Sequence, residues 1–181
     1  MQSKNELRAE LRAKRKAIDK KAQKSADIAR KILEMPEVKS ADTLLVFYPL
    51  EDEVDLLPIA RYAWSCGKLV GFPLCEDKNG VMTFRLVSSL ADLSQKSFGI
   101  MEPSESAPIA VPQNAVIFLP ALAIDKNGYR IGYGKGYYDR YLAAHANRSL
   151  YKVGVIYKAL LCNGLPHDEY DVPCDTVVCE D

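Results

Sequence analysis

The chain has 181 residues, of which 48% are hydrophobic and 27% charged, and its 24 Lys and Arg balance its 24 Asp and Glu. This length suits one domain over residues 1–181, and no apolar stretch is long enough to span a bilayer. The five cysteines form no C-x-x-C pair, and the charged N-terminus lacks the apolar core of a signal peptide. We therefore expect a cytoplasmic protein with reduced thiols, without a disulfide framework or a zinc site.

The first predicted element is a basic helical arm over residues 1–35. Residues 1–31 hold 11 of the 24 Lys and Arg against four acidic residues, so this segment carries a net charge of +7. Apolar residues form one stripe of the helix, and Lys4 and Arg8 begin an adjoining basic face. Three interpretations stay open: a solvated helix, an arm for nucleic acid, or a helix that lends Lys4 and Arg8 to an anionic ligand.

The rest of the chain alternates between strand and helix patterns. Strands are expected over residues 43–48, 68–72, 81–87, 115–124, 151–157 and 176–179, and helices over 55–66 and 137–146. We expect Asp55 to cap the first of these helices, Gly67 to end it, and Asn79-Gly80 to form a turn. Prolines interrupt residues 88–113, which predicts little regular structure there. The alternation predicts an α/β three-layer sandwich with a mostly parallel central sheet flanked by helices.

The segment RIGYGKGYYDR, residues 130–140, lies between an expected buried strand and an expected helix. Its alternate glycines, Gly132, Gly134 and Gly136, indicate a backbone with unusual dihedrals or a close approach to a ligand. A strand, a glycine-rich turn and a helix N-terminus form an anion site, to which Arg130 and Lys135 would add positive charge. The pattern predicts a phosphate-binding loop, and the alternative is a tight turn without a ligand.

The spacing of this segment fits neither common phosphate motif. It is not G-x-x-x-x-G-K-[ST], and Tyr137 or Tyr138 stands where the dinucleotide fingerprint requires a third glycine.

A second polar cluster, residues 48–55, follows the first expected strand. Ligands of open α/β sheets bind beyond the carboxyl ends of the strands, where this acidic loop and the glycine loop would both lie. Its carboxylates suit a metal or an amide-bearing ligand, whereas a solvated turn with a helix cap would account for most of them. Tyr48 and Glu53, at the base of the loop, are the strongest candidates for a ligand site.

The segment FLPALAIDKNGYRIGYGKGYYDRYL, residues 118–142, resembles the signature of the 5-formyltetrahydrofolate cyclo-ligase family, also called methenyltetrahydrofolate synthetase. The similarity extends to Lys4-x-x-x-Arg8, to the acidic loop, to residues 99–103 and to Asp171-x-x-x-Asp175. The residues of the long block that match the family pattern are Pro120, Asp125, Gly128, Arg130, Gly132, Gly134, Gly136, Tyr137, Tyr138 and Asp139, with Ile131 in place of a leucine.

The resemblance implies an enzyme that uses ATP and Mg²⁺ to convert 5-formyltetrahydrofolate into 5,10-methenyltetrahydrofolate, with release of ADP and phosphate. The γ-phosphoryl group passes to the formyl oxygen, and the second folate nitrogen then closes the ring. Phosphoryl transfer depends on positioning and charge neutralisation, which suits a chain with two histidines. The implied partners are ATP and the folate, with or without a polyglutamate tail. We expect a monomer that binds neither nucleic acid nor membrane.

The resemblance also implies roles for individual residues. Lys135 and Arg130 would be catalytic, with Lys135 on the γ-phosphate, and Asp139 and Asp175 would be metal-linked. The ATP-binding residues would be Lys4, Arg8, Arg130, Ile131, Gly132, Tyr133, Gly134, Lys135, Gly136, Tyr137 and Tyr138. The folate-binding residues would be Tyr48, Glu53, Tyr133, Gly134, Lys135, Gly136 and Tyr137.

Three positions depart from the family pattern. Leu160 stands where many members have a glutamine, Tyr170 where a histidine is frequent, and Cys179 where a threonine is usual. These departures concern the folate side and the tail. Two rival functions stay open: another ATP-dependent small-molecule ligase or phosphotransferase, and a nucleic-acid-binding module built on the basic helix.

Overall fold

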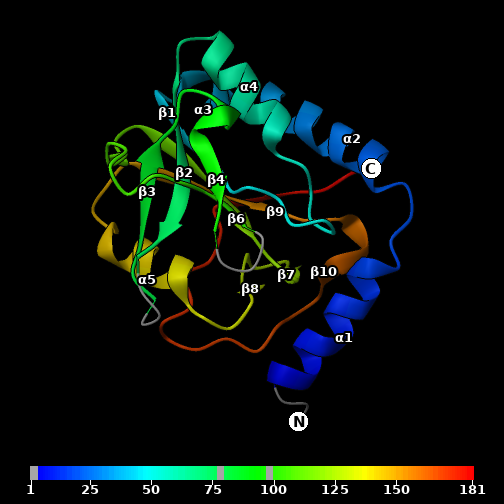
Figure 1. Cartoon of the computed structure of the whole chain (residues 1–181). Coiled ribbons are helices and arrows are strands. Elements are labelled where there is room, and N and C mark those ends of the chain that lie inside the picture. The colour runs from blue at the N-terminus through cyan, green and yellow to red at the C-terminus, as the bar shows by residue number, and fades with distance from the viewer. Residues whose placement is uncertain (1–3, 77–79, 97–99) are drawn as a thin grey trace.

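The computed structural model describes residues 4–76, 80–96 and 100–181. A six-stranded sheet in the order β11-β9-β6-β1-β2-β3 runs through its centre (Figure 1). Neighbouring strands are parallel except β2 and β3, which form an antiparallel pair. The mostly parallel sheet is therefore confirmed. The strands are β1 (Thr43–Leu45), β2 (Leu69–Cys75), β3 (Met82–Leu86), β6 (Ala115–Pro120), β9 (Leu150–Val155) and β11 (Thr176–Val178).

Helices cover both faces of this sheet. Successive strand residues point to opposite faces, so strands that are apolar throughout need packing partners on each side. Leu44 of β1 belongs to one hydrophobic cluster and its neighbour Leu45 to the other. The first cluster packs against α2 (Lys21–Glu34), α3 (Pro36–Ser40) and α4 (Leu57–Ser65), and the second against α5 (Tyr137–Ala144). The three-layer sandwich is thus confirmed.

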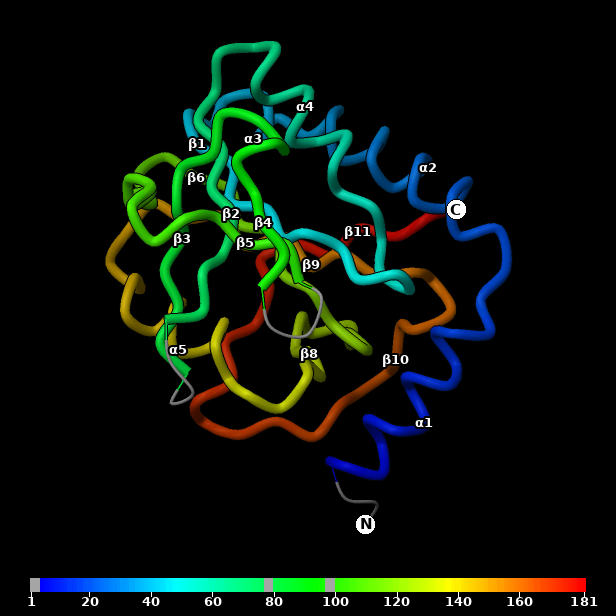
Figure 2. The backbone as a smooth tube through the Cα atoms, viewed as in Figure 1, coloured from blue at the N-terminus to red at the C-terminus, as the bar shows by residue number. Residues whose placement is uncertain are grey.

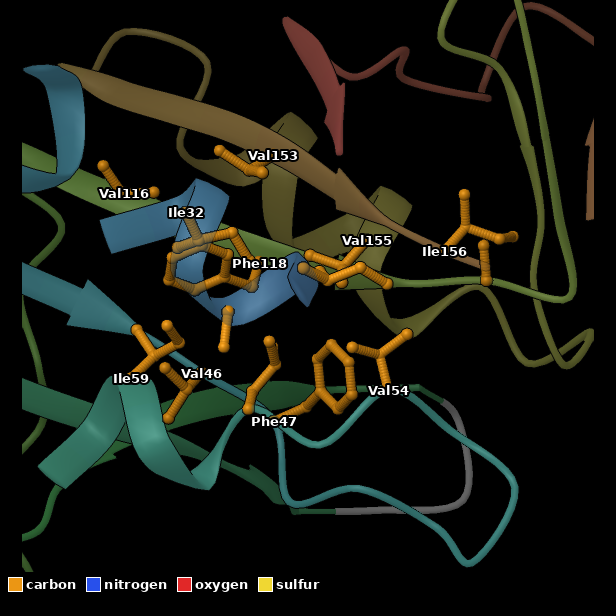
Figure 3. Packing of buried hydrophobic residues seen from close by; sticks show 14 of the residues in the cluster. Ile32, Val46, Phe47, Val54, Ile59, Val116, Phe118, Val153, Val155 and Ile156 are labelled. Carbon is orange, nitrogen blue, oxygen red and sulfur yellow. The ribbon is translucent and has the colours of Figure 1, made fainter. Parts of the chain in front are cut away.

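The larger cluster fixes α2 and α4 against the sheet. Figure 3 shows Ile32 of α2 and Ile59 of α4 close to Val46 and Phe118 at the centre of the packing. All four side chains are fully buried. Burying an aliphatic or aromatic side chain of this size contributes about 1.5–3 kcal/mol. This layer therefore supplies much of the free energy that holds α2 and α4 on the sheet.

Two of the predicted signals of α4 are found in the structure, but its N-cap is Leu56, without a side-chain cap, and not Asp55. The Leu57 amide donates to Asp55 Oδ1 at 2.9 Å, Pro58 lies in the first turn, and Gly67 follows the helix with φ +72°. Gly80 also has a positive φ, as a turn requires, while Asn79 and Gly99 lie outside the described residues.

The predicted basic arm consists of two helices with different surroundings. Helix α1 (Lys4–Lys16) ends before Lys20, which has φ +50°, and α2 begins directly after it. Helix α2 is a core helix, since Ile28 and Ile32 are fully buried. Figure 1 shows that α1 extends away from the other helices, so only α1 resembles the expected arm. None of the described helices is long and apolar enough to cross a membrane.

The strand predicted over residues 115–124 is two strands. After β6 the chain turns away from β9, because the Leu122 amide donates to the Ile131 carbonyl at 2.7 Å. It then forms β7 (Ala123–Asp125) in a small sheet with β8 (Arg130–Ile131) and β10 (Leu161–Cys162). This small sheet carries the start of the glycine segment below the edge of the main sheet (Figure 2).

Two further predictions were wrong in extent. The strand expected to end near Phe72 continues through Pro73 to Cys75, because β1 pairs only as far as Gly71 and leaves the proline without a neighbour on that side. Residues 88–113, expected to lack regular structure, contain a short hairpin of β4 (Leu93–Gln95) and β5 (Met101–Pro103).

Candidate active site

The carboxyl ends of β1, β6 and β9 meet at one edge of the sheet, as the parallel order requires. A small cavity of about 10 Å³ lies there, enough for about one water molecule. Its lining comes from the last residues of β6 and β9, from the segments that follow the three strands and from helix α1. The lining residues are Arg15, Phe47, Glu53, Val54, Pro120, Ala121, Val155, Ile156, Tyr157 and Leu160.

The glycine loop, residues 132–136, connects β8 to α5. Gly134 and Gly136 have φ of +96° and +67°, a region that favours glycine, and Gly136 is the N-cap of α5. Gly132 has no such φ, and a Cβ added there would meet no described atom within 4 Å. The unusual backbone inferred from the three glycines therefore holds for two of them. Lys135 is exposed at the loop tip.

The acidic loop and the glycine loop are in direct contact. The Tyr133 hydroxyl donates to Glu53 Oε1 in a short hydrogen bond, and the Leu50 amide donates to Glu53 Oε2 at 2.9 Å. Burial raises the pKa of Tyr133 above its usual range, and the Glu53 carboxylate raises it further, so the phenol keeps its proton. The Glu53 side chain is only 7% exposed.

Arg15 completes this group and was not among the predicted site residues. Its Nη1 donates to the Tyr133 hydroxyl at 2.6 Å and lies 3.6 Å from Glu53 Oε1. Its position in the sequence gives a signal in retrospect, because residues 4, 8 and 15 fall on one face of a helix with 3.6 residues per turn.

Helix α1 lies across the glycine loop. Arg8 Nε donates to the Gly132 carbonyl at 3.1 Å, and a Cβ at Gly134 would lie 3.2 Å from the Arg8 guanidinium carbon. Lys4 Nζ lies 3.1 Å from Asp168 Oδ2 and 3.3 Å from Asp171 Oδ2, so the tail holds the start of the helix. Figure 2 shows this tail passing between β8 and α1. Helix α1 is therefore more than a solvated basic helix.

The predicted metal-linked carboxylates each have a cationic partner. Asp139 Oδ1 lies 3.0 Å from Arg130 Nη2 and also accepts hydrogen bonds from Arg130 Nη1 and the Val172 amide. Asp175 pairs with Lys152, whose Nζ lies 2.9 Å from Oδ1 and whose amide donates to Oδ2. In the described ranges no three His, Cys, Asp or Glu side chains cluster as a metal site.

The remaining candidates are spread around this core. Tyr48 packs against the larger hydrophobic cluster, and Tyr137 and Tyr138, in the first turn of α5, pack against the smaller one. Burial also raises the pKa of Tyr138 well above its ordinary value. Of the three departures from the family pattern, only Leu160 reaches the site, where it is buried and lines the cavity. Tyr170 is exposed, and Cys179 borders the larger cluster.

The chain matches the family model described as the 5-formyltetrahydrofolate cyclo-ligase family over residues 1–180. It belongs to the 5-formyltetrahydrofolate cyclo-ligase family. A mouse 5-formyltetrahydrofolate cyclo-ligase is 30% identical over 191 aligned residues, which cover 99% of this chain and 94% of the relative. This cyclo-ligase family is an enzyme family, and the matched residues include the glycine loop.

Solved structures of cyclo-ligase relatives share the fold. The 5,10-methenyltetrahydrofolate synthetase of Aquifex aeolicus superposes with a TM-score of 0.81 at 32% identity, covering 98% of this chain and 91% of that one. A second synthetase, from Mycoplasma pneumoniae, has a TM-score of 0.77 at 22% identity and covers 99% and 100% of the two chains. In this member of the cyclo-ligase family, Arg15 contacts both the glycine loop, through Tyr133, and the acidic loop, through Glu53. These loops carry the predicted ATP-binding and folate-binding residues.

Proposed function

We propose that this chain converts 5-formyltetrahydrofolate into 5,10-methenyltetrahydrofolate with ATP and Mg²⁺, releasing ADP and phosphate. The observation that carries the proposal is the contact between Tyr133 of the glycine loop and Glu53 of the acidic loop. It brings an anion-binding loop beside a buried carboxylate within a chain of this family, so a phosphoryl donor and a folate would meet there.

The proposed chemistry has two steps. The formyl oxygen attacks the γ-phosphorus of ATP, and the bond from that phosphorus to the ADP oxygen breaks. The second folate nitrogen then attacks the formyl carbon, the carbon–oxygen bond breaks, and phosphate leaves as that nitrogen loses its proton. Phosphorylation is needed because a formamide oxygen is a poor leaving group. Such transfer requires positioned cations and backbone N–H groups more than a protein nucleophile.

The glycine loop and α1 form the proposed ATP side. Lys135 is exposed and makes no hydrogen bond or ion pair through its side chain with the described residues, so it is available for the γ-phosphate. The N-terminus of α5 adds backbone donors and the positive end of the helix dipole. Lys4 and Arg8 would reach the phosphates from α1. Residues 131–134 and 136–138 would line the nucleotide. Arg130 pairs with Asp139 and would add its positive charge to the ATP phosphates next to that carboxylate.

The acidic loop forms the proposed folate side. A pterin presents adjacent N–H groups, and the Glu53 carboxylate is an acceptor matched to them. Tyr48 lies on the same loop, and residues 133–137 would face the folate from the opposite side. Leu160 makes this part of the lining apolar, where many relatives have an amide.

Asp139 and Asp175 are the proposed Mg²⁺-linked residues. Mg²⁺ is usually held by one or two carboxylates together with substrate phosphates and water, and Asp139 and Asp175 would supply these carboxylates. The described hydrogen bonds of Asp139 use Oδ1, which leaves Oδ2 for a metal, whereas both oxygens of Asp175 contact Lys152. The ion would neutralise phosphate charge. Arg130 holds the Asp139 carboxylate in place.

We also propose that residues 1–181 form one catalytic domain that acts as a cytoplasmic monomer. Its partners would be the two substrates, with the folate bearing a polyglutamate tail or none, and no nucleic acid.

The test is to mix the purified chain with 5-formyltetrahydrofolate, Mg²⁺ and ATP and to follow the methenyl chromophore. Product that requires all three components supports the proposal. ATP binding without product would favour another ATP-dependent ligase or phosphotransferase. Salt-dependent binding of RNA or DNA without turnover would favour the nucleic-acid-binding module instead.

A further inference from the structure

Arg15 is a buried charged residue on an otherwise mostly exposed helix. Leu11 and Arg15 are the two buried residues of α1, and Arg15 is 7% exposed. Its guanidinium carbon lies 5.5 Å from the centre of the Tyr133 ring, in addition to the 2.6 Å hydrogen bond to the Tyr133 hydroxyl. Arg15 therefore holds both the ring and the hydroxyl of a loop residue that lies 118 positions away in the sequence.

The hydrogen bonds among Arg15, Tyr133 and Glu53 have a fixed direction. A phenol has one proton, and Tyr133 gives it to Glu53 Oε1. The Tyr133 hydroxyl oxygen must then accept from Arg15, which has only donors and supplies Nη1–H. The chain of bonds runs from Arg15 through Tyr133 to Glu53, so the orientation of the Glu53 carboxylate depends on Arg15.

Stability alone does not account for a guanidinium at this place. Arg15 Nε is buried and has no hydrogen-bond partner among the described residues. A buried donor without a partner costs about 1–3 kcal/mol, more when the group is charged. A straight apolar side chain at position 15 would avoid this cost but would leave the buried Glu53 carboxylate without its cation, so the guanidinium is tied to Glu53 rather than to packing alone.

The place of Arg15 on α1 connects it with the proposed ATP side. Residues 8 and 15 are seven positions apart, which puts them on the same face two turns from each other. Arg8 contacts Gly132 in the glycine loop, and Arg15 contacts Tyr133 in the same loop. Of the two, only Arg15 also reaches Glu53 on the folate side.

We propose that Arg15 is a positioning residue for the folate, acting through the Tyr133 hydroxyl on the Glu53 carboxylate. This inference rests on the proposed function. It assigns Arg15 an effect on folate recognition that is separate from the phosphate contacts of Lys4, Arg8 and Lys135.

The first experiment compares Arg15→Met with Arg12→Met, since methionine keeps much of the length of the stem and removes the charge. Arg12 is a matched control: it is exposed, and its guanidinium carbon lies 6.0 Å from the centre of the same ring. We expect Arg15→Met to raise the KM for the folate about tenfold, which corresponds to about 1.4 kcal/mol. We expect the KM for ATP to change less than about threefold and Arg12→Met to behave like the wild type, within the usual scatter of surface substitutions.

The second experiment is a double-mutant cycle of Arg15→Met with Tyr133→Phe, read on the KM for the folate. If Arg15 acts through the Tyr133 hydroxyl, the KM of the double variant for the folate is nearly that of the single variant with the higher KM. Effects of the two changes that multiply would overturn the proposal, as would a KM for Arg15→Met equal to that of Arg12→Met. Arg15→Lys keeps the charge and serves if the methionine variant does not fold. We expect the KM of Arg15→Lys for the folate to lie between those of the wild type and Tyr133→Phe. A KM above that of Tyr133→Phe would count against the proposal.

The two proposals fail in different ways. A wild-type chain that forms no methenyl product overturns the proposed function, and the inference with it. A wild-type chain with normal turnover, combined with additive effects in the cycle, overturns only the role of Arg15.

Discussion

The Tyr133 hydroxyl donates a hydrogen bond to Glu53 Oε1 and joins two loops that are 80 residues apart in the chain. Tyr133 belongs to the loop proposed to bind ATP, and Glu53 belongs to the loop proposed to bind the folate. Both loops lie beyond the carboxyl ends of the central strands, the usual place for ligands in this class of sheet. The predictions below test the two sides of this contact separately.

Lys135→Ala is expected to lower the rate of methenyl formation about 100-fold or more, since removal of one positioned donor to developing charge costs about 10²–10³ in rate. The fold should survive, because Lys135 is exposed. Steady-state turnover and the circular dichroism spectrum check this, with exposed Lys126→Ala as the control. Full activity of Lys135→Ala would remove Lys135 from the phosphate site.

Glu53→Gln is expected to weaken folate binding about tenfold or more, because a carboxylate accepts hydrogen bonds about twice as strongly as a neutral group does. The glutamine has nearly the same shape, but its single oxygen can accept from the Tyr133 hydroxyl or from the Leu50 amide and not from both. Separate titrations with ATP and with the folate check this, and ATP affinity should be unchanged. An equal loss of both affinities would contradict the assignment of Glu53 to the folate.

Asp139→Asn and Asp175→Asn are expected to raise the Mg²⁺ concentration needed for half-maximal turnover, because Mg²⁺ prefers charged oxygen ligands. Their effects on stability should differ. The Arg130 side chain is 4% exposed, so Asp139→Asn leaves a buried charge without its anionic partner and should cost up to about 3–5 kcal/mol. Lys152 and Asp175 are 22% and 36% exposed, and surface pairs contribute about 0–1 kcal/mol. Urea unfolding of both variants measures this difference, and unchanged Mg²⁺ dependence would refute the metal assignment.

The attachment of α1 to the tail should depend on pH at the acidic end. The hydrogen bond from Lys4 lowers the pKa of Asp168 below its ordinary value of 3.8. Burial lowers the pKa of Lys4, but the hydrogen bonds with Asp168 and Asp171 outweigh it, so the net shift is above 10.5. The carboxylate contribution is present above pH 3.8 and is lost as the pH falls through the lower pKa of the folded state. The lysine contribution is present below pH 10.5 and is lost only above it.

Amide protection in residues 8–11 of α1 is therefore expected to be stable near neutral pH and to fall below about pH 4. Hydrogen exchange followed by NMR, corrected for intrinsic rates, measures it. In Lys4→Met the amide protection at neutral pH should already be lower than in the wild type. It should also fall less as the pH is lowered below about 4. Identical pH curves for this variant and the wild type would show that the ion pairs do not hold the helix.

Gly128→Ala is expected to destabilise the chain by about 1–3 kcal/mol, the usual cost of a residue held in a sparsely populated backbone region. Gly128 has φ +84°, and a Cβ there would lie 2.6 Å from the Cys174 carbonyl oxygen. Gly132→Ala is the matched control, with open space around the added methyl group. Its unfolding free energy should stay within about 0.5 kcal/mol of the wild type or rise slightly. Equal losses in both variants would contradict the backbone argument.

The sequence by itself determined the layers, the parallel sheet and the two loops of the site. These follow from local rules: the period of the apolar residues, and alternate glycines that open a helix. The long block around Gly132, Gly134 and Gly136 also indicated the family, because its spacing is specific.

Only the tertiary structure decided which side chains meet. The contact of Arg15 with Tyr133 and Glu53 joins three segments far apart in the chain, and no local pattern specifies such a contact. The break after Pro120 has the same cause, since Leu122 pairs with Ile131 of a later strand. Local periodicity records which face of an element is buried, whereas partners across the site are set by packing of the whole chain.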